Sequence, residues 1–128
     1  MANYATFKEF GKKKTGKVNH ETVTINGIKF DSRAEADRYT VLRVMEKTGK
    51  ISGLECHPRW EIIPKQEVPG HRNFQAAHYT ADFKYYKDGE LIVEDVKSTY
   101  TREAPDWVLR RKLMYQVHGI YVREILNG

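Results

Sequence analysis

The sequence is poor in cysteine and has no long apolar run. Its single cysteine, Cys56, excludes an internal disulfide, and no spaced pair of Cys or His residues of the zinc-binding kind is present. No apolar segment is longer than a few residues, so we expect neither a membrane span nor a signal peptide. These absences predict a cytoplasmic protein in a reducing compartment.

The sequence also lacks internal repeats, and its positive charge is unevenly distributed. The 128 residues are enough for one domain with a substantial core. The net charge is +5, but most of the excess lies in residues 1–20, where five lysines accompany a single glutamate. We therefore expect a flexible basic arm at 1–20 followed by a single domain at 21–128. Such an arm suits phosphate contacts, and it is equally ordinary as a solubilising terminus.

Turn residues and apolar periodicity divide the domain into short elements. In order, the patterns predict a hairpin around Asn26-Gly27, a helix from Asp31 or Ser32 to about Thr48, strands within 51–63 with a break near His57-Pro58, a loop at 64–76, a hairpin over 77–98, a helix from Pro105 to Gly119 and a strand at 120–126. The main elements follow the order α, β, β, β, α, β. This order favours an α/β fold of the α+β kind, with a mixed sheet and a helix on each side.

The hairpin over 77–98 carries charged residues that strands do not favour. From residue 79 it runs YTADFKYYKDGELIVEDVKSTY, in which Asp82, Asp95 and Lys97 interrupt aromatic and β-branched runs. Aspartate and lysine are depleted in strands. Their presence here therefore indicates a requirement other than folding.

The turn at Asp88-Gly89 fixes the predicted register of this hairpin. A two-residue Asp-Gly turn of type I′ is the strongest short hairpin signal. Counting outward from it gives the pairs Lys87 with Glu90, Tyr86 with Leu91, Tyr85 with Ile92, Lys84 with Val93, Phe83 with Glu94, and Asp82 with Asp95. Because side chains alternate between the two faces, Lys97 lies on the face of Asp95, with Thr80 as its partner. The three charged groups are thus expected to converge.

Two opposed carboxylates repel one another unless a cation lies between them. With Cβ atoms about 5 Å apart, like charges disfavour the pairing by about 1 kcal/mol. A bound Mg²⁺ ion would turn this repulsion into attraction, since Mg²⁺ takes one or two carboxylates together with water and phosphate. A lysine beside it would hold or activate an attacking water. The competing interpretation is a solvated face on which Lys84 and Lys97 neutralise the two aspartates, and the hairpin alone does not separate the two.

Glu35, in the first predicted helix, admits two roles. Ser32 and Glu35 form an S-x-x-E capping box, which is a sufficient structural reason for the glutamate. Glu35 also shares one helix face with Tyr39 and Leu42, so its carboxylate projects toward the expected sheet, where it needs a donor or a metal. The two roles are alternatives, since one side chain cannot easily serve both at once, and the sequence leaves both open.

Three segments together resemble the PD-(D/E)XK nuclease superfamily, and in particular its small phage and prophage endonuclease-like members. They are FDSRAEADRYTVL, YTADF and VEDVKS, in that order, and the likeness covers most of residues 28–126. The resemblance implies a restriction-endonuclease-like αβββαβ core, with a helix on each side of a four- to five-stranded sheet. One departure is Ala81, which occupies the position of the motif's proline, a residue that is not a ligand.

The resemblance implies that Asp82, Asp95 and Lys97 form the motif, and that the family's helical acid falls on Glu35. We then expect a Mg²⁺-dependent endonuclease that hydrolyses DNA phosphodiester bonds, with Mn²⁺ as a substitute and with branched or phage-replication DNA among its substrates. The two aspartates and the backbone carbonyl of Val96 would bind the metal together with Glu35. Lys97 would orient the attacking water or offset charge on the phosphate.

The weakest assignments concern contacts with DNA. The candidates are Lys12, Lys13 and Lys14 of the basic arm and Lys112 of the predicted second helix. Lys112 belongs to the cationic run 110–112, which helical spacing spreads around most of the circumference, so at most one or two of its members reach a common phosphate track. For any one member of this run, a solvated helix face is the favoured interpretation.

Two alternatives and two further expectations complete the prediction. The first alternative is a non-catalytic nucleic-acid-binding protein that uses the basic arm, with the hairpin charges as a salt-bridge cluster. The second is an interaction module of a phage assembly, in which the arm docks on an acidic partner. The resemblance also implies a homodimer in the cytoplasm of a bacterium or phage-infected cell.

Glu94 is a rival for Asp95 as the second acid of the motif, but it points to the opposite face.

Overall fold

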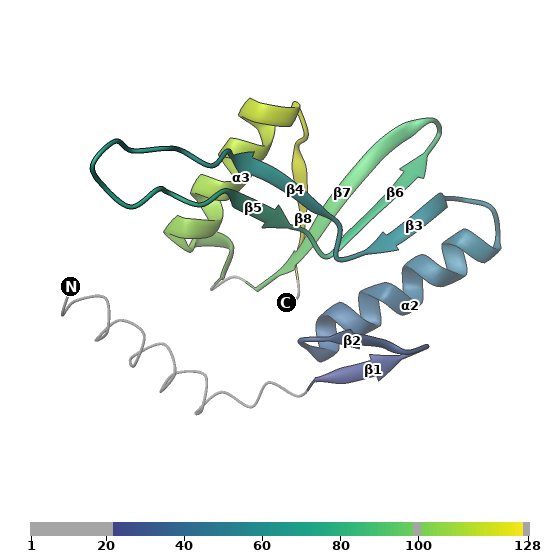
Figure 1. Ribbon diagram of the computed structural model, residues 1–128. Coiled ribbons are helices and arrows are strands. Elements are labelled where there is room, and N and C mark those ends of the chain that lie inside the picture. Colours follow the sequence, from purple (N-terminus) through teal and green to yellow (C-terminus); the bar gives the residue numbers. More distant parts are fainter. Residues whose placement is uncertain (1–21, 99–100, 127–128) are drawn as a thin grey trace. The chain divides into compact units, whose positions relative to one another are not determined.

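The computed structural model describes residues 22–98 and 101–126 (Figure 1). The chain divides into two compact units, residues 1–37 and residues 38–128, with the boundary inside helix α2 (Arg33–Lys47). The predicted basic arm, including its three candidate DNA-binding lysines at 12–14, lies outside the described residues.

The first unit contains the predicted N-terminal hairpin. Strands β1 (Val23–Ile25) and β2 (Ile28–Phe30) pair antiparallel. Asn26 and Gly27 between them have φ angles of 52° and 79°, the left-handed values that a type I′ turn requires. Helix α2 begins directly after the predicted cap, Ser32, so both elements are confirmed.

The second unit is built on a four-stranded sheet with the strand order β3-β6-β7-β8. Its strands are β3 (Ser52–Cys56), β6 (Phe83–Lys87), β7 (Glu90–Lys97) and β8 (Val122–Leu126). β6 pairs antiparallel with both β3 and β7, whereas β8 is parallel to β7. The predicted mixed sheet is therefore confirmed, and the fold belongs to the mixed α/β class.

The β6–β7 hairpin has the predicted register, from Lys87 opposite Glu90 to Phe83 opposite Glu94. Its two turn residues have φ angles of 51° and 80°, again those of a type I′ turn. A slip by one residue would exchange the two faces of each strand, so the turn also determines which charged side chains share a face.

After β3 the chain bends and enters a separate two-stranded sheet. It consists of β4 (Arg59–Ile63) and β5 (Ala77–Thr80), which pair antiparallel. The chain bends at His57-Pro58, between β3 and β4, and at Ala81-Asp82, between β5 and β6. Two backbone hydrogen bonds of 2.9 and 3.0 Å join these bends. The predicted break is confirmed, and because proline has no N–H, an unbroken ladder cannot run through it.

This bend corrects one part of the predicted register. Thr80 lies opposite Arg59 in the two-stranded sheet, and Lys97 lies opposite Leu126 in the parallel pair of β7 and β8. The expected pairing of Thr80 with Lys97 is therefore wrong. Its physical reason is that the β6–β7 ladder ends at Phe83, before the chain reaches Thr80.

Helix α3 (Pro105–His118) follows a short 3₁₀ turn, η1 (Thr101–Glu103), and has the predicted ends. Proline is accommodated in its first turn, where the missing N–H would have no helical partner. Gly119 has a φ of 69°, and its N–H donates to the carbonyl of Tyr115 at 2.9 Å. A left-handed glycine of this kind ends the helix and turns the chain into β8.

The sheet of the second unit has a helix against each face, as predicted. On one face, α3 supplies two members of a buried cluster, which consists of Ile62, Tyr79, Ala81, Val93, Trp107, Met114 and Val122. On the other face, Tyr39 of α2 stacks on Phe83, with ring centroids 6.4 Å apart. Because side chains alternate along β7, Asp95 faces α3 and Glu94 faces α2.

No helix among residues 22–98 and 101–126 is both long and apolar enough to cross a membrane.

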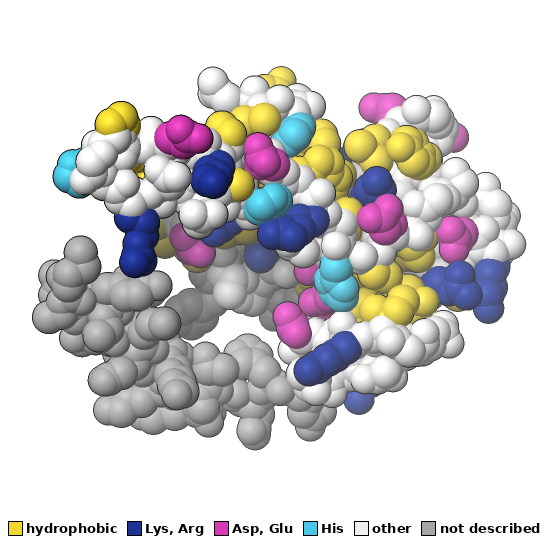
Figure 2. All heavy atoms as spheres, viewed as in Figure 1, with side chains coloured by type: hydrophobic (Ala, Val, Ile, Leu, Met, Phe, Trp, Pro, Cys, Tyr) yellow, Lys and Arg dark blue, Asp and Glu magenta, His cyan; other side chains and the backbone are white. Residues whose placement is uncertain are grey.

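Figure 2 shows Lys and Arg side chains interspersed with Asp and Glu on the visible surface. Lys and Arg side chains are therefore not gathered into one patch on the described part of this face.

Candidate functional site

One hydrogen bond joins Asp82 to Asp95, and a second joins Asp82 to Val96, the residue after Asp95. The backbone N–H of Asp82 donates to Oδ1 of Asp95 at 2.8 Å, and the backbone N–H of Val96 donates to Oδ2 of Asp82 at 2.7 Å. Asp82 lies in the bend before β6, outside the strand ladder. The predicted strand pairing of Asp82 with Asp95 is not formed, because the β6–β7 ladder ends at Phe83 opposite Glu94. A side-chain hydrogen bond brings the two residues together instead.

Asp95 is buried, with 3% of its surface exposed, and is held by two aromatic donors. Its Oδ2 accepts hydrogen bonds from the hydroxyl of Tyr79 and, at 3.2 Å, from Nε1 of Trp107. Nε1 of Trp107 also lies 3.0 Å from the Tyr79 hydroxyl. Burial and the negative charge of Asp95 raise the pKa of Tyr79 well above its ordinary range, so this phenol remains a neutral donor at physiological pH.

These bonds leave Asp95 with acceptor capacity on one oxygen. An ionised carboxylate offers about four acceptor positions. Oδ2 uses two of them for Tyr79 and Trp107, and Oδ1 uses one for the N–H of Asp82. Among the described residues, the remaining position on Oδ1 is the one at which Asp95 can bind a further donor or a cation.

A cavity of about 290 Å³ opens beside the two aspartates. Its lining residues are His78, Tyr79, Thr80, Asp82, Asp95, Lys97, Trp107 and Arg110. The structure thus brings Asp82, Asp95 and Lys97 to one cavity, which we call the carboxylate cavity. Nζ of Lys97 lies 5.1 Å from the centroid of the Trp107 ring, a cation–π distance, so its ammonium is placed within the cavity wall.

Arg110 is a cationic member of the carboxylate cavity that the sequence did not single out. Its Nη1 donates to the carbonyl of His78 at 2.6 Å. Lys112, the predicted choice from the same run, lines a different cavity. The sequence signal that could have identified Arg110 is its spacing from Trp107. It follows Trp107 by three residues and so lies on the same side of the helix.

Glu94 belongs to a different cluster on the opposite face of the sheet. Arg38 donates to it twice, from Nε at 2.6 Å and from Nη2 at 2.9 Å, and the Tyr85 hydroxyl donates to it at 2.7 Å. The hydrogen bond with Glu94 raises the pKa of Arg38, and burial together with that carboxylate raises the pKa of Tyr85 to about 12. Glu94 is thus a paired structural carboxylate, which agrees with the preference for Asp95.

Glu35 lies in the first turn of α2 and belongs to the first unit, whereas both aspartates belong to the second. Its backbone N–H donates to Oγ of Ser32 at 3.1 Å, which is one half of the predicted capping box. Its side chain is buried, with 6% of the residue's surface exposed. The cap is therefore confirmed on the Ser32 side, and the role of Glu35 as a ligand stays a prediction.

The donors of the carboxylate cavity suit a hard cation that keeps much of its water. The described residues contain no group of three or more His, Cys, Asp or Glu side chains that could hold a metal ion. Asp82 and Asp95 form a pair, and the carbonyl of Val96 follows directly in β7. One or two carboxylates completed by water and substrate phosphate are the usual donors for Mg²⁺, so the residues present fit this ion.

Comparison with known proteins gives a family but no activity. Residues 15–125 match the model of a family described as "Protein of unknown function (DUF1064)". Neither a search of curated proteins nor a search of solved structures found a match. The carboxylate cavity is therefore the feature of this chain that indicates a function.

Proposed function

We propose that this chain, which belongs to the DUF1064 family, is a metal-dependent endonuclease of the PD-(D/E)XK kind that hydrolyses phosphodiester bonds in DNA. One observation carries the proposal: Asp82, Asp95 and Lys97 line a single cavity of about 290 Å³. These residues supply the negative oxygens that bind a hard cation and a positive group beside them, which is the combination that phosphoryl transfer to water requires.

In this proposal, Asp82, Asp95 and the Val96 carbonyl would hold Mg²⁺, with Mn²⁺ as a substitute. When bound, the ion would supply Lewis-acid polarisation of the scissile phosphate and would lower the pKa of a water molecule. Tyr79 and Trp107 act on the reaction indirectly, because their hydrogen bonds fix the Asp95 carboxylate and leave Oδ1 for the ion.

The cations of the carboxylate cavity have separate roles. Lys97 donates to the attacking water or to a non-bridging phosphate oxygen, where negative charge increases in the transition state. Arg110 is exposed at the same cavity and offers a guanidinium to a neighbouring phosphate. For Glu35, the ligand role is what the resemblance implies. Lys112 and the lysines at 12–14 are further candidates for contacts with the DNA backbone.

A non-catalytic nucleic-acid-binding protein is the second candidate. The hydrogen bonds of Asp82 with Val96 and of Asp95 with Tyr79 also suit a purely structural pair that closes the bend before β6. Binding by such a protein depends on the basic arm, falls steeply with salt and is indifferent to Mg²⁺.

The deciding experiment incubates the purified full chain with linear, nicked and branched DNA, in Mg²⁺, in Mn²⁺ and in EDTA. The key variant is Asp82→Asn, which removes one charge while its amide oxygen can still accept from Val96. The matched control is Asp106→Asn, at an exposed position in the first turn of α3. We expect metal-dependent cleavage by the parent chain and the control, and none by Asp82→Asn. Equal cleavage by all three, or no cleavage of any substrate, would refute the nuclease.

The proposal extends to assembly and location. An endonuclease that cuts both strands of a duplex commonly acts as a dimer, so we expect a homodimer in the cytoplasm of a bacterium or phage-infected cell. Light scattering coupled to size exclusion measures the mass of the full chain in solution. A mass of one chain at the concentration that cuts both strands contradicts the dimer and leaves the chemistry intact.

A further inference from the structure

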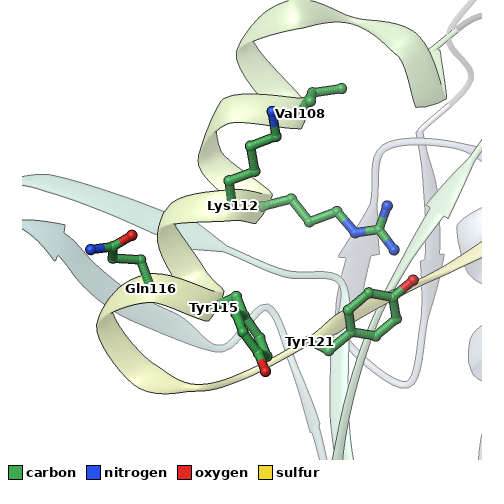
Figure 3. Close-up of a pocket in the computed structure, with 6 residues that line it drawn as sticks. Val108, Lys112, Tyr115, Gln116 and Tyr121 are labelled. Atoms are coloured by element: carbon green, nitrogen blue, oxygen red, sulfur yellow. The ribbon is translucent and has the colours of Figure 1, made fainter.

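A second cavity, of about 510 Å³, lies on α3 away from the two aspartates. Its lining residues are Val108, Arg111, Lys112, Tyr115, Gln116 and Tyr121. Five of them recur along α3 at the spacing of a single helix face, and Tyr121 comes from the segment that leads into β8 (Figure 3). We call this site the tyrosine cavity. Its volume lies within the range of about 300–1,000 Å³ that small-ligand sites occupy.

The composition of the tyrosine cavity indicates a ligand that is both flat and negatively charged. Tyr115 and Tyr121 are 62% and 64% exposed, so two large aromatic rings remain in contact with water. The six lining residues include two cations and no carboxylate. An apolar protein surface would complement the rings, but it would leave Arg111 and Lys112 without a counter-charge.

Arg111 is already fixed in the orientation that such a ligand needs. Its Nε donates to the carbonyl of Val122 at 2.9 Å. Its guanidinium carbon lies 4.7 Å from the ring centroid of Tyr121 and 5.1 Å from that of Trp107. A cation held between two rings loses little side-chain freedom when an anion binds, so little of the binding free energy is spent on ordering it.

Trp107 connects the two cavities. Nζ of Lys97, in the carboxylate cavity, and the guanidinium carbon of Arg111, in the tyrosine cavity, each lie 5.1 Å from the Trp107 ring centroid. The two positive groups are therefore at most about 10 Å apart. Successive phosphates of one DNA strand are about 3.4 Å apart along the helix axis, so about three nucleotides span this distance. The two cations are thus close enough to contact neighbouring phosphates of one strand.

We propose that the tyrosine cavity binds an unpaired nucleotide of a DNA strand, with its base stacked on Tyr121 or Tyr115 and its phosphate held by Lys112 and Arg111. The faces of paired bases are hidden in the duplex stack, so only an unpaired base can stack on these rings. The inference rests on the proposed function for its link to cleavage, and it narrows the substrate class to DNA with unpaired bases beside the scissile phosphate, such as branches and flaps.

The test measures binding without cleavage, by fluorescence anisotropy of labelled DNA in EDTA. The full chain is titrated with a single strand, with a duplex of the same length and with an abasic single strand that retains the phosphates. The variants are Tyr121→Ala, Tyr121→Phe and Tyr115→Ala. The control is Phe74→Ala, which removes an aromatic ring of similar exposure (61%) that lines neither cavity. The basic arm is the same in all variants, so differences between them report on the cavity.

We expect the single strand to bind more tightly than the duplex or the abasic strand. Tyr121→Ala should weaken binding to the single strand by about 5- to 100-fold, and Tyr121→Phe and the control by less than about twofold. Equal binding of abasic and base-containing strands, or unchanged binding by both Ala variants, overturns the inference in favour of a peptide or other occupant. Cleavage in Mg²⁺ is measured separately on the same DNA substrates. Absence of cleavage by the parent chain alone counts against the nuclease, and loss of Tyr121 dependence alone counts against the tyrosine cavity.

Discussion

Glu94 and Asp95 are consecutive in β7, but their carboxylates lie on opposite faces of the sheet and have different partners. Arg38 and Tyr85 donate three hydrogen bonds to Glu94. Asp95 instead accepts from Tyr79 on the face that carries the carboxylate cavity. Alternation along one strand therefore separates a structural acid from the candidate catalytic acid.

Loss of the Glu94 charge should destabilise the fold. The side chain of Glu94 is 1% exposed and that of Arg38 is 25% exposed, so Glu94→Gln leaves a partly buried guanidinium without its counter-charge. We expect the free energy of unfolding to fall by about 2–4 kcal/mol. Urea denaturation followed by far-UV circular dichroism measures the change.

The matched control for this prediction is Glu90→Gln, an exposed glutamate at the start of the same strand. Its effect should stay within about 0.5 kcal/mol, as for most surface substitutions. Similar urea midpoints for the two variants would show that the Arg38 pair contributes no more than a surface charge.

Replacement of Lys97 should separate catalysis from folding. Lys97→Ala removes the ammonium that faces the carboxylate cavity, and loss of one donor to transition-state charge lowers rates by about 10²- to 10³-fold. The cation–π contact with Trp107 is also lost, at a cost of about 1 kcal/mol in stability. Single-turnover cleavage measures the rate, with Lys87→Ala, an exposed lysine of β6, as the control. A Lys97→Ala rate within tenfold of the parent contradicts the assigned role.

The Tyr79–Asp95 hydrogen bond should make stability depend on alkaline pH. Because the pKa of Tyr79 is raised in the folded state, the folded protein holds this proton more tightly than the unfolded chain does. The corresponding stability is complete below the unfolded pKa of about 10 and is lost as pH rises from there toward the folded pKa. The loss reaches about 1.4 kcal/mol per pH unit at most.

Tyr79→Phe tests this dependence, because phenylalanine cannot titrate. At pH 7 the variant should be less stable than the parent by about 1–3 kcal/mol, since Asp95 loses a buried donor. Above pH 10 the difference should shrink, while lysines and other tyrosines affect both proteins alike. Urea denaturation at pH 7, 10 and 11 provides the comparison, and parallel pH curves for the two proteins would exclude the hydrogen bond as the cause.

The sequence made the β6–β7 register predictable because the turn at Asp88-Gly89 is self-contained. Both turn residues take a positive φ, and the number of residues from the turn then determines each pair. The bend at Ala81 is different, since it depends on Pro58, which lies across from it in a distant segment. A local pattern therefore predicted the hairpin but not the point at which its first strand ends.

The same distinction applies to the carboxylate cavity. Asp95 and Lys97 were predictable on one face of β7 because side chains alternate along a strand, whereas Asp82 reaches Asp95 through a hydrogen bond beyond the end of the β6–β7 ladder. The donors to Asp95 come from another strand and from α3, so their role appears only in the packed structure. Tyr79 and Trp107, taken singly in the sequence, are indistinguishable from ordinary core aromatics. The rotation of α3, which brings Arg110 to this cavity, is likewise set by packing.

Trp107→Phe should weaken metal-dependent cleavage while leaving both aspartates in place. Phenylalanine keeps most of the apolar contact area but cannot donate to Asp95 Oδ2 or to the Tyr79 hydroxyl, so the carboxylate loses one of its fixed donors. Loss of a partner that orients a metal ligand typically lowers metal affinity or activity by about 10- to 100-fold. We expect the Mg²⁺ concentration for half-maximal cleavage to rise by such a factor. Trp60→Phe, in a partly buried tryptophan packed against the same core, is the control and should leave the Mg²⁺ dependence unchanged. If both variants shift it equally, the effect arises from general core packing and the orienting role of Trp107 is wrong.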